Sequence, residues 1–482
     1  MMISFMSNRL AGLSFLLVVL VAAAAADPGA NRLNVLFLIA DDLNCDLGSY
    51  GVAGMKTPNI DALAARGVRF ERAYCQFPNC SPSRSSFLTG RRPNVTGVLV
   101  NPAPAHPLSP HFREKLPSTV TLPQLFKNNG WFTARVGKLY HYGVPKDIGT
   151  SSLDDFYSWD LVVNPRGRDR ERDLEERIVS LKPGPFGGTL SWLADEEGRD
   201  DEHTDGIGAT EAVELLERFS RKDRPFFLAV GFYRPHTPYV APAKYFDLYP
   251  RDSIELPEVS PVDRARQPAL AYASARPEQD AATVAQRRSA IQAYHASISF
   301  MDAQVGRVLE ALDRLGLRES TIVVFTSDHG YHLGDHGLWQ KQSLFERATH
   351  VPLIIAAPGA RGNGQTAPGV AALLDLYPTL AELGGLPVPG YVDGVSLRPV
   401  LDDPLARPRA QAVSQVWRGA GREGYAVRTE RWRYIEWDSG AHDTQLFDLD
   451  ADPGETVNRA ADPACAALVA QFQAVVAREQ QP

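Results

Sequence analysis

Residues 33–42 read Leu33-Asn34-Val35-Leu36-Phe37-Leu38-Ile39-Ala40-Asp41-Asp42, and this stretch decides the fold. Its first eight residues form a nearly continuous aliphatic run, which is typical of a strand covered on both faces in a parallel sheet. Ligands of open α/β sheets bind beyond the carboxyl ends of the strands, so Asp41 and Asp42 fall where a binding site is expected. The stretch therefore predicts an α/β fold with a large, mostly parallel central sheet flanked by helices.

A second run, from Thr321 to Ser327, leads in the same way into Asp328-His329-Gly330. Acidic residues after a strand are ordinary turn residues, and either motif alone would be interpreted so. Three carboxylates that meet at one sheet edge repel one another, however, and a bound cation resolves that repulsion. Carboxylate oxygens favour Ca²⁺ or Mg²⁺, whereas His329 is atypical for calcium and leaves another divalent ion open.

Two further apolar runs are followed by basic or imidazole side chains. The segment 131–141 predicts a strand followed by Lys138 and His141, and the run 225–230 is followed by His236 between two prolines. The prolines hold that loop extended and rigid, which suits a side chain that must be positioned. A lone loop histidine is usually solvated, but both histidines follow apolar runs as the acidic pairs do. All four segments are therefore expected to meet at one sheet edge.

A fifth segment, Cys80-Ser81-Pro82-Ser83-Arg84, places a thiol, a proline and an arginine within five positions. Pro82 fixes a backbone dihedral and can start a helix whose free N–H groups face an anion. Arg84 would then lie one turn into that helix as a planar fork for an oxyanion. A cysteine near a proline is more often a small buried hydrophobe or half of a disulfide. The other four segments favour a functional site over that interpretation.

The Cys80-x-Pro-Ser-Arg84 motif, followed by Thr89-Gly90-Arg91, resembles the signature of the type I sulfatases. In that family the cysteine is converted after translation to formylglycine (3-oxoalanine) by a formylglycine-generating or anaerobic sulfatase-maturating enzyme. The resemblance implies an alkaline phosphatase-like sandwich with a small C-terminal antiparallel sheet and one helix. It also implies a metal, Ca²⁺ or alternatively Mg²⁺, held by Asp41, Asp42, Asp328, His329 and an oxygen of the formylglycine made from Cys80.

The same resemblance implies the catalytic roles. Arg84, Lys138 and Lys341 would neutralise the nonbridging oxygens of a sulfate ester together with the metal. One hydroxyl of the aldehyde hydrate would attack sulfur and displace the alcohol. His236 is the candidate acid for the leaving oxygen and His141 the candidate base that expels sulfate, and the two roles can be exchanged.

Within the family the motifs are most similar to the iduronate-2-sulfatases, which implies removal of a 2-O-sulfate from a terminal uronate in sulfated oligosaccharides. Asn94, where an acidic residue is common, and the proline-rich loop 98–110 depart from that pattern. Three alternatives stay open. They are a sulfatase for another sulfated glycan or an aryl sulfate, a phosphonate or phosphate monoester hydrolase of the same fold, and a non-catalytic binder of sulfated glycans.

Composition fits one large and one small domain. The chain has 482 residues, of which 44% are hydrophobic, and its net charge of −7 provides no global field for nucleic acid. Residues 27–405 are interpreted as the catalytic domain and 406–482 as a C-terminal subdomain of four short strands, within 411–416, 424–429, 432–437 and 445–448, and a helix at 461–478.

Residues 1–26 have a short positive region, an apolar core and small residues, which predicts a secretory signal peptide and a secreted or periplasmic protein without stable membrane insertion. The alternative, a membrane anchor, is weaker because the apolar core is short. Of four cysteines, three remain if Cys80 is modified, so at most one bridge forms within the chain, and Cys45 with Cys75 is the candidate pair.

Several other segments have patterns typical of core packing or of solvated loops. Residues 57–66 and 288–315 have helical periodicity and are expected to pack against the core. The run 166–173 alternates in charge, which favours a solvated excursion over a polyanion site. His332 and His336, close to the second acidic motif, are interpreted as loop structure or substrate contacts.

Overall fold

The computed structural model describes residues 32–102, 111–184, 186–259, 264–265, 267–419, 421–441 and 443–481. The predicted signal peptide and most of the loop 98–110 lie outside these residues. Within them, no helix is long and apolar enough to cross a membrane.

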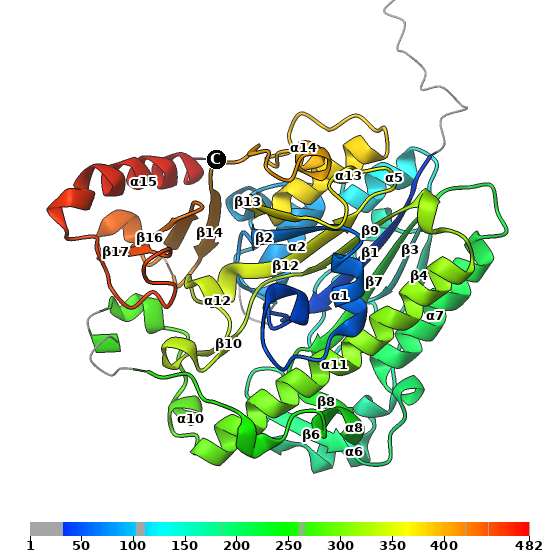
Figure 1. Ribbon diagram of the computed structural model, residues 1–482, viewed down its shortest axis with the longest axis horizontal. Coiled ribbons are helices and arrows are strands. Elements are labelled where there is room, and N and C mark those ends of the chain that lie inside the picture. The colour runs from blue at the N-terminus through cyan, green and yellow to red at the C-terminus, as the bar shows by residue number, and fades with distance from the viewer. Residues whose placement is uncertain are drawn as a thin grey trace, which may run out of the picture. The chain divides into compact units, whose positions relative to one another are not determined.

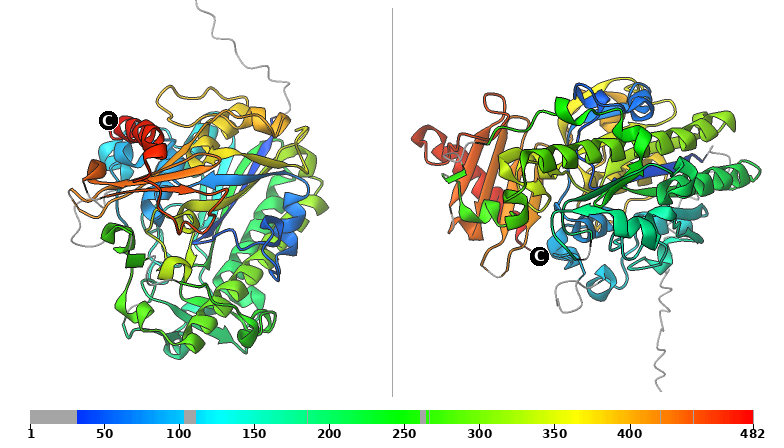
Figure 2. Two further views of the ribbon diagram at one scale, coloured as in Figure 1. Left: turned by 60° about the vertical axis from the view of Figure 1, so that its left-hand side comes forward. Right: turned by 90° about the horizontal axis from the view of Figure 1, so that it is seen from below.

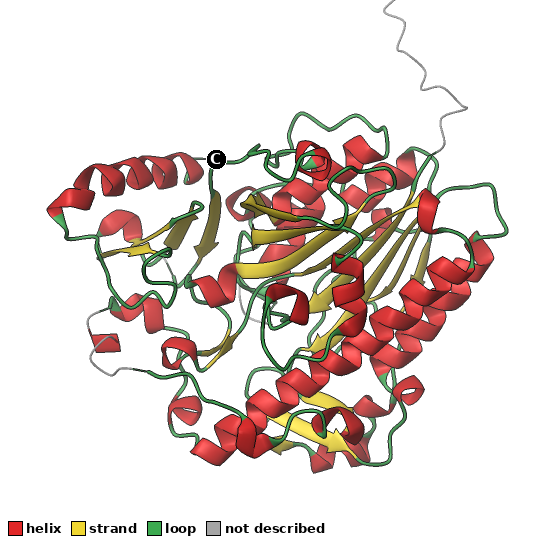
Figure 3. Cartoon of the chain, viewed as in Figure 1, coloured by secondary structure: helices red, strands yellow, loops and turns green. Residues whose placement is uncertain are grey.

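An eight-stranded sheet forms the centre of the molecule, as predicted (Figures 1 and 3). Its strand order is β13-β2-β12-β9-β1-β7-β3-β4, and β12 runs antiparallel to both of its neighbours while the other pairs are parallel. The strands are β1 (Asn34–Asp41), β2 (Val68–Tyr74), β3 (Phe132–Gly137), β4 (Leu161–Val163), β7 (Phe226–Pro235), β9 (Thr321–Ser327), β12 (His350–Ala356) and β13 (Thr366–Ala372).

Strand β1 lies inside the sheet between β7 and β9 and is buried along its whole length. Its side chains alternate between two cores, because successive residues of a strand point to opposite faces. Leu36, Leu38 and Ala40 belong to one core, and Val35, Phe37 and Ile39 belong to the other. The continuous apolar run is thus explained by burial on both faces, and the prediction from residues 33–42 is confirmed.

Helices cover both faces of the sheet (Figure 2). The first core takes residues from α1 (Pro58–Ala64), α7 (Thr204–Phe219) and the long α11 (Val284–Arg314), and the second from α2 (Cys80–Thr89), α5 (Leu122–Asn128), α13 (Leu376–Leu383) and α14 (Arg398–Asp402). Helix α11 begins four residues before the predicted start, because Thr283 and Gln286 form a capping box there. Short helices occupy the connections: α3 (Pro93–Thr96), α4 (Phe112–Lys115), α6 (Arg172–Arg177), α8 (Ala243–Phe246), α10 (Pro277–Asp280) and α12 (Glu346–Thr349).

A second, four-stranded antiparallel sheet follows with the order β14-β15-β16-β17, and α15 (Ala466–Glu479) packs on it. Its strands are β14 (Ala412–Val416), β15 (Gly424–Arg428), β16 (Trp432–Trp437) and β17 (Thr444–Asp448). The predicted strands and helix are confirmed, although α15 starts five residues late because Asp462 caps a separate 3₁₀ turn, Pro463–Cys465.

Two smaller sheets complete the fold. One pairs β5 (Val179–Ser180), β6 (Ser191–Asp195) and β8 (Tyr239–Pro242), and the other is the hairpin of β10 (His332–Leu333) and β11 (Trp339–Gln340). The possible bridge between Cys45 and Cys75 is not formed, because both residues are free thiols.

Candidate active site

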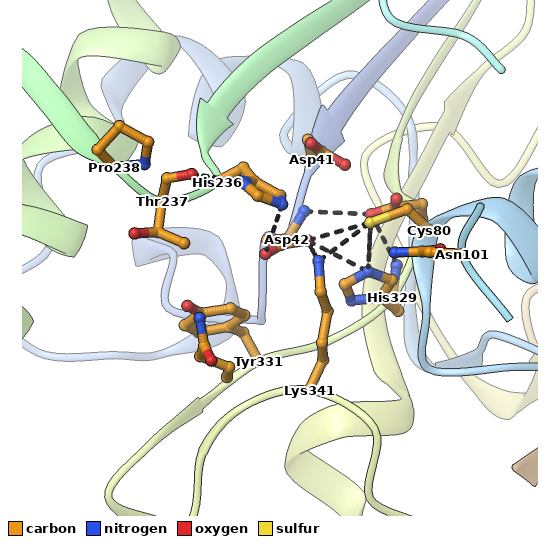
Figure 4. Close-up of polar contacts among 12 residues, drawn as sticks. Asp41, Asp42, Cys80, Asn101, His236, Thr237, Pro238, His329, Tyr331 and Lys341 are labelled. Atoms are coloured by element: carbon orange, nitrogen blue, oxygen red, sulfur yellow. Dashed lines mark hydrogen bonds and ion pairs between the residues drawn. The ribbon is translucent and has the colours of Figure 1, made fainter. Parts of the chain in front are cut away.

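Helix α2 places Cys80 at the first position of its N-terminus, where the helix dipole is positive. The Cys80 side chain is buried, and Asn101 closes the helix end from outside by accepting a hydrogen bond from Ser81 N at 2.9 Å. Arg84 lies one turn further along the same helix, as the sequence predicted. The remaining candidate residues come from the carboxyl end of β1 and from the segments after β1, β3, β7, β9 and β11. Figure 4 shows Asp42, His329 and Lys341 around the Cys80 sulfur.

Two of the three acidic candidates, Asp41 and Asp328, meet through Arg84. The buried guanidinium of Arg84 donates from Nη2 to Asp41 at 3.1 Å and from Nε to Asp328 at 2.9 Å. Its Nη1 donates to the carbonyls of Lys138 and Leu139 at 2.7 and 3.0 Å. The expectation that Arg84 offers a fork to an oxyanion is therefore corrected, because these donors are occupied by protein acceptors. Arg84 holds the carboxylates in place instead.

Two lysines approach the same carboxylates from different elements. Lys138, which directly follows β3, places Nζ 2.5 Å from Asp41 and is completely buried. Lys341, which follows β11, places Nζ 2.5 Å from Asp42 and 3.0 Å from the Cys80 sulfur. The three carboxylates and the three cations, Arg84 included, balance in charge. A divalent cation added to this set would leave an excess of two positive charges, which favours an anionic ligand.

His329 and His236 turn the same ring nitrogen toward this cluster. Nδ1 of His329 is 2.9 Å from the carbonyl of Gly330, and Nδ1 of His236 is 2.6 Å from the carbonyl of Thr237. A carbonyl only accepts, so each Nδ1 carries a proton, and Nε2 faces the site. Nε2 of His329 lies 3.4 Å from the Cys80 sulfur, and Nε2 of His236 lies 3.7 Å from Asp42 Oδ2.

His141 also reaches the cluster. Burial lowers the pKa of His141, and the nearby Cys80 side chain partly offsets this effect. Its Nδ1 is buried without a hydrogen-bond partner among the described residues. Every residue that the sequence predicted for the site is therefore within this one cluster.

The charges strongly perturb one another. Burial alone would raise the pKa of the Cys80 thiol, but Lys138, Lys341 and His329 together hold that pKa well below its usual range. Burial raises the pKa of Asp328 to about 6. For His329, burial is outweighed by Asp328, and the pKa rises to about 10. Such shifts, caused by burial together with specific charged partners, are typical of functional sites.

The side chains present fit a divalent cation. Asp42, Cys80, Asp328 and His329 bring four ligand atoms within 4.8 Å of one another, and Asp41, Asp42, Cys80 and His236 form an overlapping set. Asp42 Oδ2 is buried and makes no hydrogen bond within the described part of the chain. A buried carboxylate oxygen without a donor is costly, and a metal ion would satisfy it. His236 belongs to the second set, although the sequence placed it only among the catalytic residues.

Sequence reasoning missed two supporting residues, Tyr294 and Asn101. The Tyr294 hydroxyl donates to the Asp42 carbonyl at 2.7 Å and accepts from Asn44 N at 2.9 Å. Tyr294 sits on α11, where its sequence pattern indicates only core packing, and Asn101 lies in a loop without any pattern. His332, by contrast, has a structural role in strand β10, since it is fully buried with Nε2 2.7 Å from Ser343 Oγ.

The helix end at Cys80, with cations and carboxylates around it, fits a sulfuric ester hydrolase, and the family match assigns the chain to this class. The family model "Sulfatase" matches residues 33–386, and the chain belongs to that family. A second model, "N-sulphoglucosamine sulphohydrolase, C-terminal", matches residues 334–481.

Individual relatives agree with this assignment. The chain is 33% identical to iduronate 2-sulfatase of Homo sapiens, over 92% of this chain and 93% of the relative. It is 32% identical to choline-sulfatase of Rhizobium meliloti, over 89% of this chain and 83% of the relative. Among solved structures, phosphonate monoester hydrolase of Agrobacterium radiobacter superposes with a TM-score of 0.75 at 24% identity, covering 93% of this chain and 95% of that one, which shows a shared fold.

Proposed function

We propose that this chain is an exported sulfatase for sulfated sugars, and that it removes the 2-O-sulfate of a terminal iduronate in glycosaminoglycans. The observation that carries the proposal is the environment of Cys80, where Lys341, His329 and Asp42 lie 3.0, 3.4 and 3.6 Å from the sulfur. The similarity to iduronate 2-sulfatase along nearly the whole chain supports the sugar and the position.

The mature residue at position 80 is proposed to be formylglycine, formed by a formylglycine-generating or anaerobic sulfatase-maturating enzyme. When present, its hydrated aldehyde supplies an oxygen nucleophile for the ester sulfur and a route for the later release of sulfate. Cys80 stands where such a group would be surrounded by cations, at a helix N-terminus. A mass spectrum of the tryptic peptide Ala73–Arg84 tests this step, and an unmodified thiol in active protein would refute it.

The side chains around position 80 then have distinct tasks. Lys138 and Lys341 would neutralise the nonbridging oxygens of the sulfate, each approaching from a different strand end. His141, whose pKa is influenced by the nearby Cys80 side chain, would accept a proton at that position. His236, whose Nε2 points into the site from β7, would donate a proton to the leaving oxygen. The exchanged assignment of the two histidines stays open.

A divalent metal, Ca²⁺ or alternatively Mg²⁺, is proposed at Asp41, Asp42, Asp328 and His329 with position 80. When bound, it would polarise the group at position 80 and attract the sulfate charge. Mostly oxygen ligands favour Ca²⁺, since the site contributes three carboxylates. Membership of the family shows that the chain is a sulfuric ester hydrolase. We propose iduronate as the sugar and the 2-O-sulfate as the group that is removed.

The test of substrate uses a disaccharide with a nonreducing 2-O-sulfated iduronate, followed by mass spectrometry, with protein made together with a formylglycine-generating enzyme. We expect loss of sulfate from the disaccharide and from 4-nitrophenyl sulfate, and none from choline sulfate. Cleavage of the aryl sulfate alone would keep the sulfatase chemistry and discard iduronate. A faster reaction with an aryl phosphonate than with the aryl sulfate would favour a phosphonate hydrolase.

A further inference from the structure

The alternating charged run 166–173 is not solvated throughout, which corrects the interpretation from sequence. Asp169, in the middle of the run, has only 4% of its surface exposed and forms an ion pair with Arg234 at 2.7 Å. Arg234, at the end of β7, is 2% exposed. Burying such an ion pair costs desolvation free energy unless further hydrogen bonds satisfy both side chains. The other hydrogen bonds of Asp169 and Arg234 therefore show which parts of the structure this pair holds together.

Arg234 uses its other donors on the loop that carries His236. Nε donates to the Val240 carbonyl at 2.9 Å, and Nη1 donates to the carbonyls of His236 and Pro238 at 3.1 and 2.9 Å. His236 is flanked by Pro235 and Pro238, which have no backbone N–H group and so donate no hydrogen bond that would hold the loop. One planar guanidinium therefore binds three carbonyls on both sides of Thr237, two of them in the loop and one in β8.

The other end of the ion pair is anchored in the core. Asp169 Oδ1 accepts hydrogen bonds from Thr204 N at 2.8 Å and from Thr204 Oγ1 at 2.6 Å. The neighbouring Asp205 accepts from the backbone N–H groups of Tyr233 and Arg234 at 2.8 and 2.9 Å. Both acidic residues thus tie the end of β7 to the first turn of α7, a helix that packs on the central sheet.

The imidazole of His236 depends on this backbone for its direction. Its Nδ1 is bonded to the carbonyl of Thr237, inside the segment that Arg234 holds, and Nε2 then points to Asp42 (Figure 4). We propose that Asp169 and Arg234 are positioning residues for His236, which aim its Nε2 at the leaving oxygen of the sulfate ester. The proposal rests on the role proposed above for His236 in sulfate ester hydrolysis.

The first test compares leaving groups in Arg234→Met and Arg234→Lys. A proton donor matters most for a poor leaving group, so a misaimed His236 should slow phenyl sulfate far more than 4-nitrophenyl sulfate. We expect kcat to fall at least about 100-fold for phenyl sulfate in Arg234→Met and less than about 10-fold for 4-nitrophenyl sulfate, with KM nearly unchanged. Arg234→Lys keeps the charge but reaches fewer carbonyls, so it should lose less. Equal losses for both esters would overturn the proposal.

A double variant separates positioning from a general loss of structure. Adding Arg234→Met to His236→Ala should cost little further activity, because the residue that Arg234 positions is already absent. Arg168→Met is the matched control. Arg168 lies in the same turn as Asp169, but it pairs with Asp195 of β6 and makes no bond to the His236 loop. Any loss of kcat in Arg168→Met should be equal for phenyl sulfate and 4-nitrophenyl sulfate. Additive losses in the double variant would contradict the proposal.

A third measurement does not require turnover. Amide hydrogen exchange in the peptide that covers residues 226–242 should rise at least about 10-fold at His236 and Thr237 in Arg234→Met and stay unchanged in Arg168→Met. If the wild-type protein cleaved no sulfate ester, the proposed function would fail while this exchange result would still decide whether Arg234 holds the loop. Unchanged exchange in Arg234→Met would refute the positioning role by itself.

Discussion

At position 42 the backbone adopts a left-handed conformation, with φ of 64°, which aspartate tolerates better than most residues. This turn lets Asp41 point to Lys138 while Asp42 points to Lys341, so the two neighbouring carboxylates serve different sides of the site. Both are buried and ion-paired. Each aspartate therefore has its own role, because the Asp41 carboxylate pairs with Lys138 and the Asp42 carboxylate pairs with Lys341.

Metal binding gives a prediction at this scale. Ca²⁺ in millimolar excess over EDTA-treated protein should raise the melting temperature, because a ligand that binds only the folded state stabilises it by mass action, by about 2.7 kcal/mol at 100 times the dissociation constant. Asp328→Asn should abolish the rise, which differential scanning calorimetry measures. Asp302→Asn is the control, since Asp302 is a buried carboxylate that binds the start of α1 outside the site. A full rise in Asp328→Asn would exclude this metal site.

His332 gives a pH-dependent prediction. Burial, with a smaller effect of His336 and Arg347, lowers its pKa to about 3 in the folded protein, against 6.5 for the free side chain. Between these values the unfolded state binds more protons, so His332 makes the free energy of unfolding fall as the pH decreases below about 6.5. By pH 5 this single group should cost roughly 2 kcal/mol.

The measurement is urea unfolding of wild-type protein and His332→Gln at pH 7.5 and pH 5. The variant keeps a polar contact for Ser343 but cannot titrate, so its free energy of unfolding should fall less on acidification. Comparing the two proteins cancels the other acid-sensitive groups. An identical fall in both proteins would show that His332 does not contribute.

At the scale of elements, α11 connects the core to the site through one side chain. Tyr294 stacks on Tyr331 at a ring distance of 5.0 Å, and its hydroxyl bonds to both sides of the turn at Asp42 and Asn44. The helix is long and packs along α7 and β7, so it gives Tyr294 a fixed position. The turn after β1 thereby takes its geometry from a helix more than 240 residues away in the chain.

Tyr294→Phe tests this connection. The variant keeps the ring but loses two buried hydrogen bonds, so we expect about 1–3 kcal/mol less stability. Because Asp42 is then less firmly placed, kcat on an aryl sulfate should fall roughly 10- to 100-fold. Tyr249→Phe is the matched control, since Tyr249 also bonds to α11, at Ser299, and to the backbone of Lys56, away from the site. A loss of rate in the control equal to that of Tyr294→Phe would refute the connection.

At the scale of the whole molecule, one hydrophobic core joins the two predicted domains. Phe77, Leu344 and Phe345 pack with residues of the C-terminal sheet, including Val416, Ile435 and Trp437. Charged contacts reinforce this core, because Glu346 pairs with Arg428 and Arg433, and Arg433 also bonds the Leu344 carbonyl. These contacts lie just after Lys341, so the C-terminal sheet supports the loop that carries this lysine.

The expected consequence is joint unfolding. Urea unfolding followed by circular dichroism and by tryptophan fluorescence should give one coincident transition, because separating residues 406–482 would expose the shared core. Replacing both tryptophans of β16, Trp432 and Trp437, by Phe identifies the fluorescence signal of the C-terminal sheet. An earlier transition that is absent from this variant would show that the sheet unfolds independently.

The sequence by itself determined the central strands, the helix at Cys80 and which residues lie together around Cys80. A strand that is buried on both faces has a continuous apolar run, so the central strands can be recognised in the sequence. The carboxyl ends of parallel strands share one edge of the sheet, so the sequence also predicts that the motifs after β1, β3, β7 and β9 lie close together. Strand and helix ends were displaced by a few residues where local caps, such as that of Thr283, decide the boundary.

Only the tertiary structure decided how the side chains share their partners. Arg84 binds carboxylates in place of an oxyanion, Asp169 is buried beneath the His236 loop, and Tyr294 holds Asp42 from α11. Each of these contacts joins residues far apart in the chain, and the spacing of residues along a sequence contains no information about which donor reaches which acceptor across the core. Hydrogen bonds and ion pairs depend on distances of about 3 Å, which only the packed fold fixes.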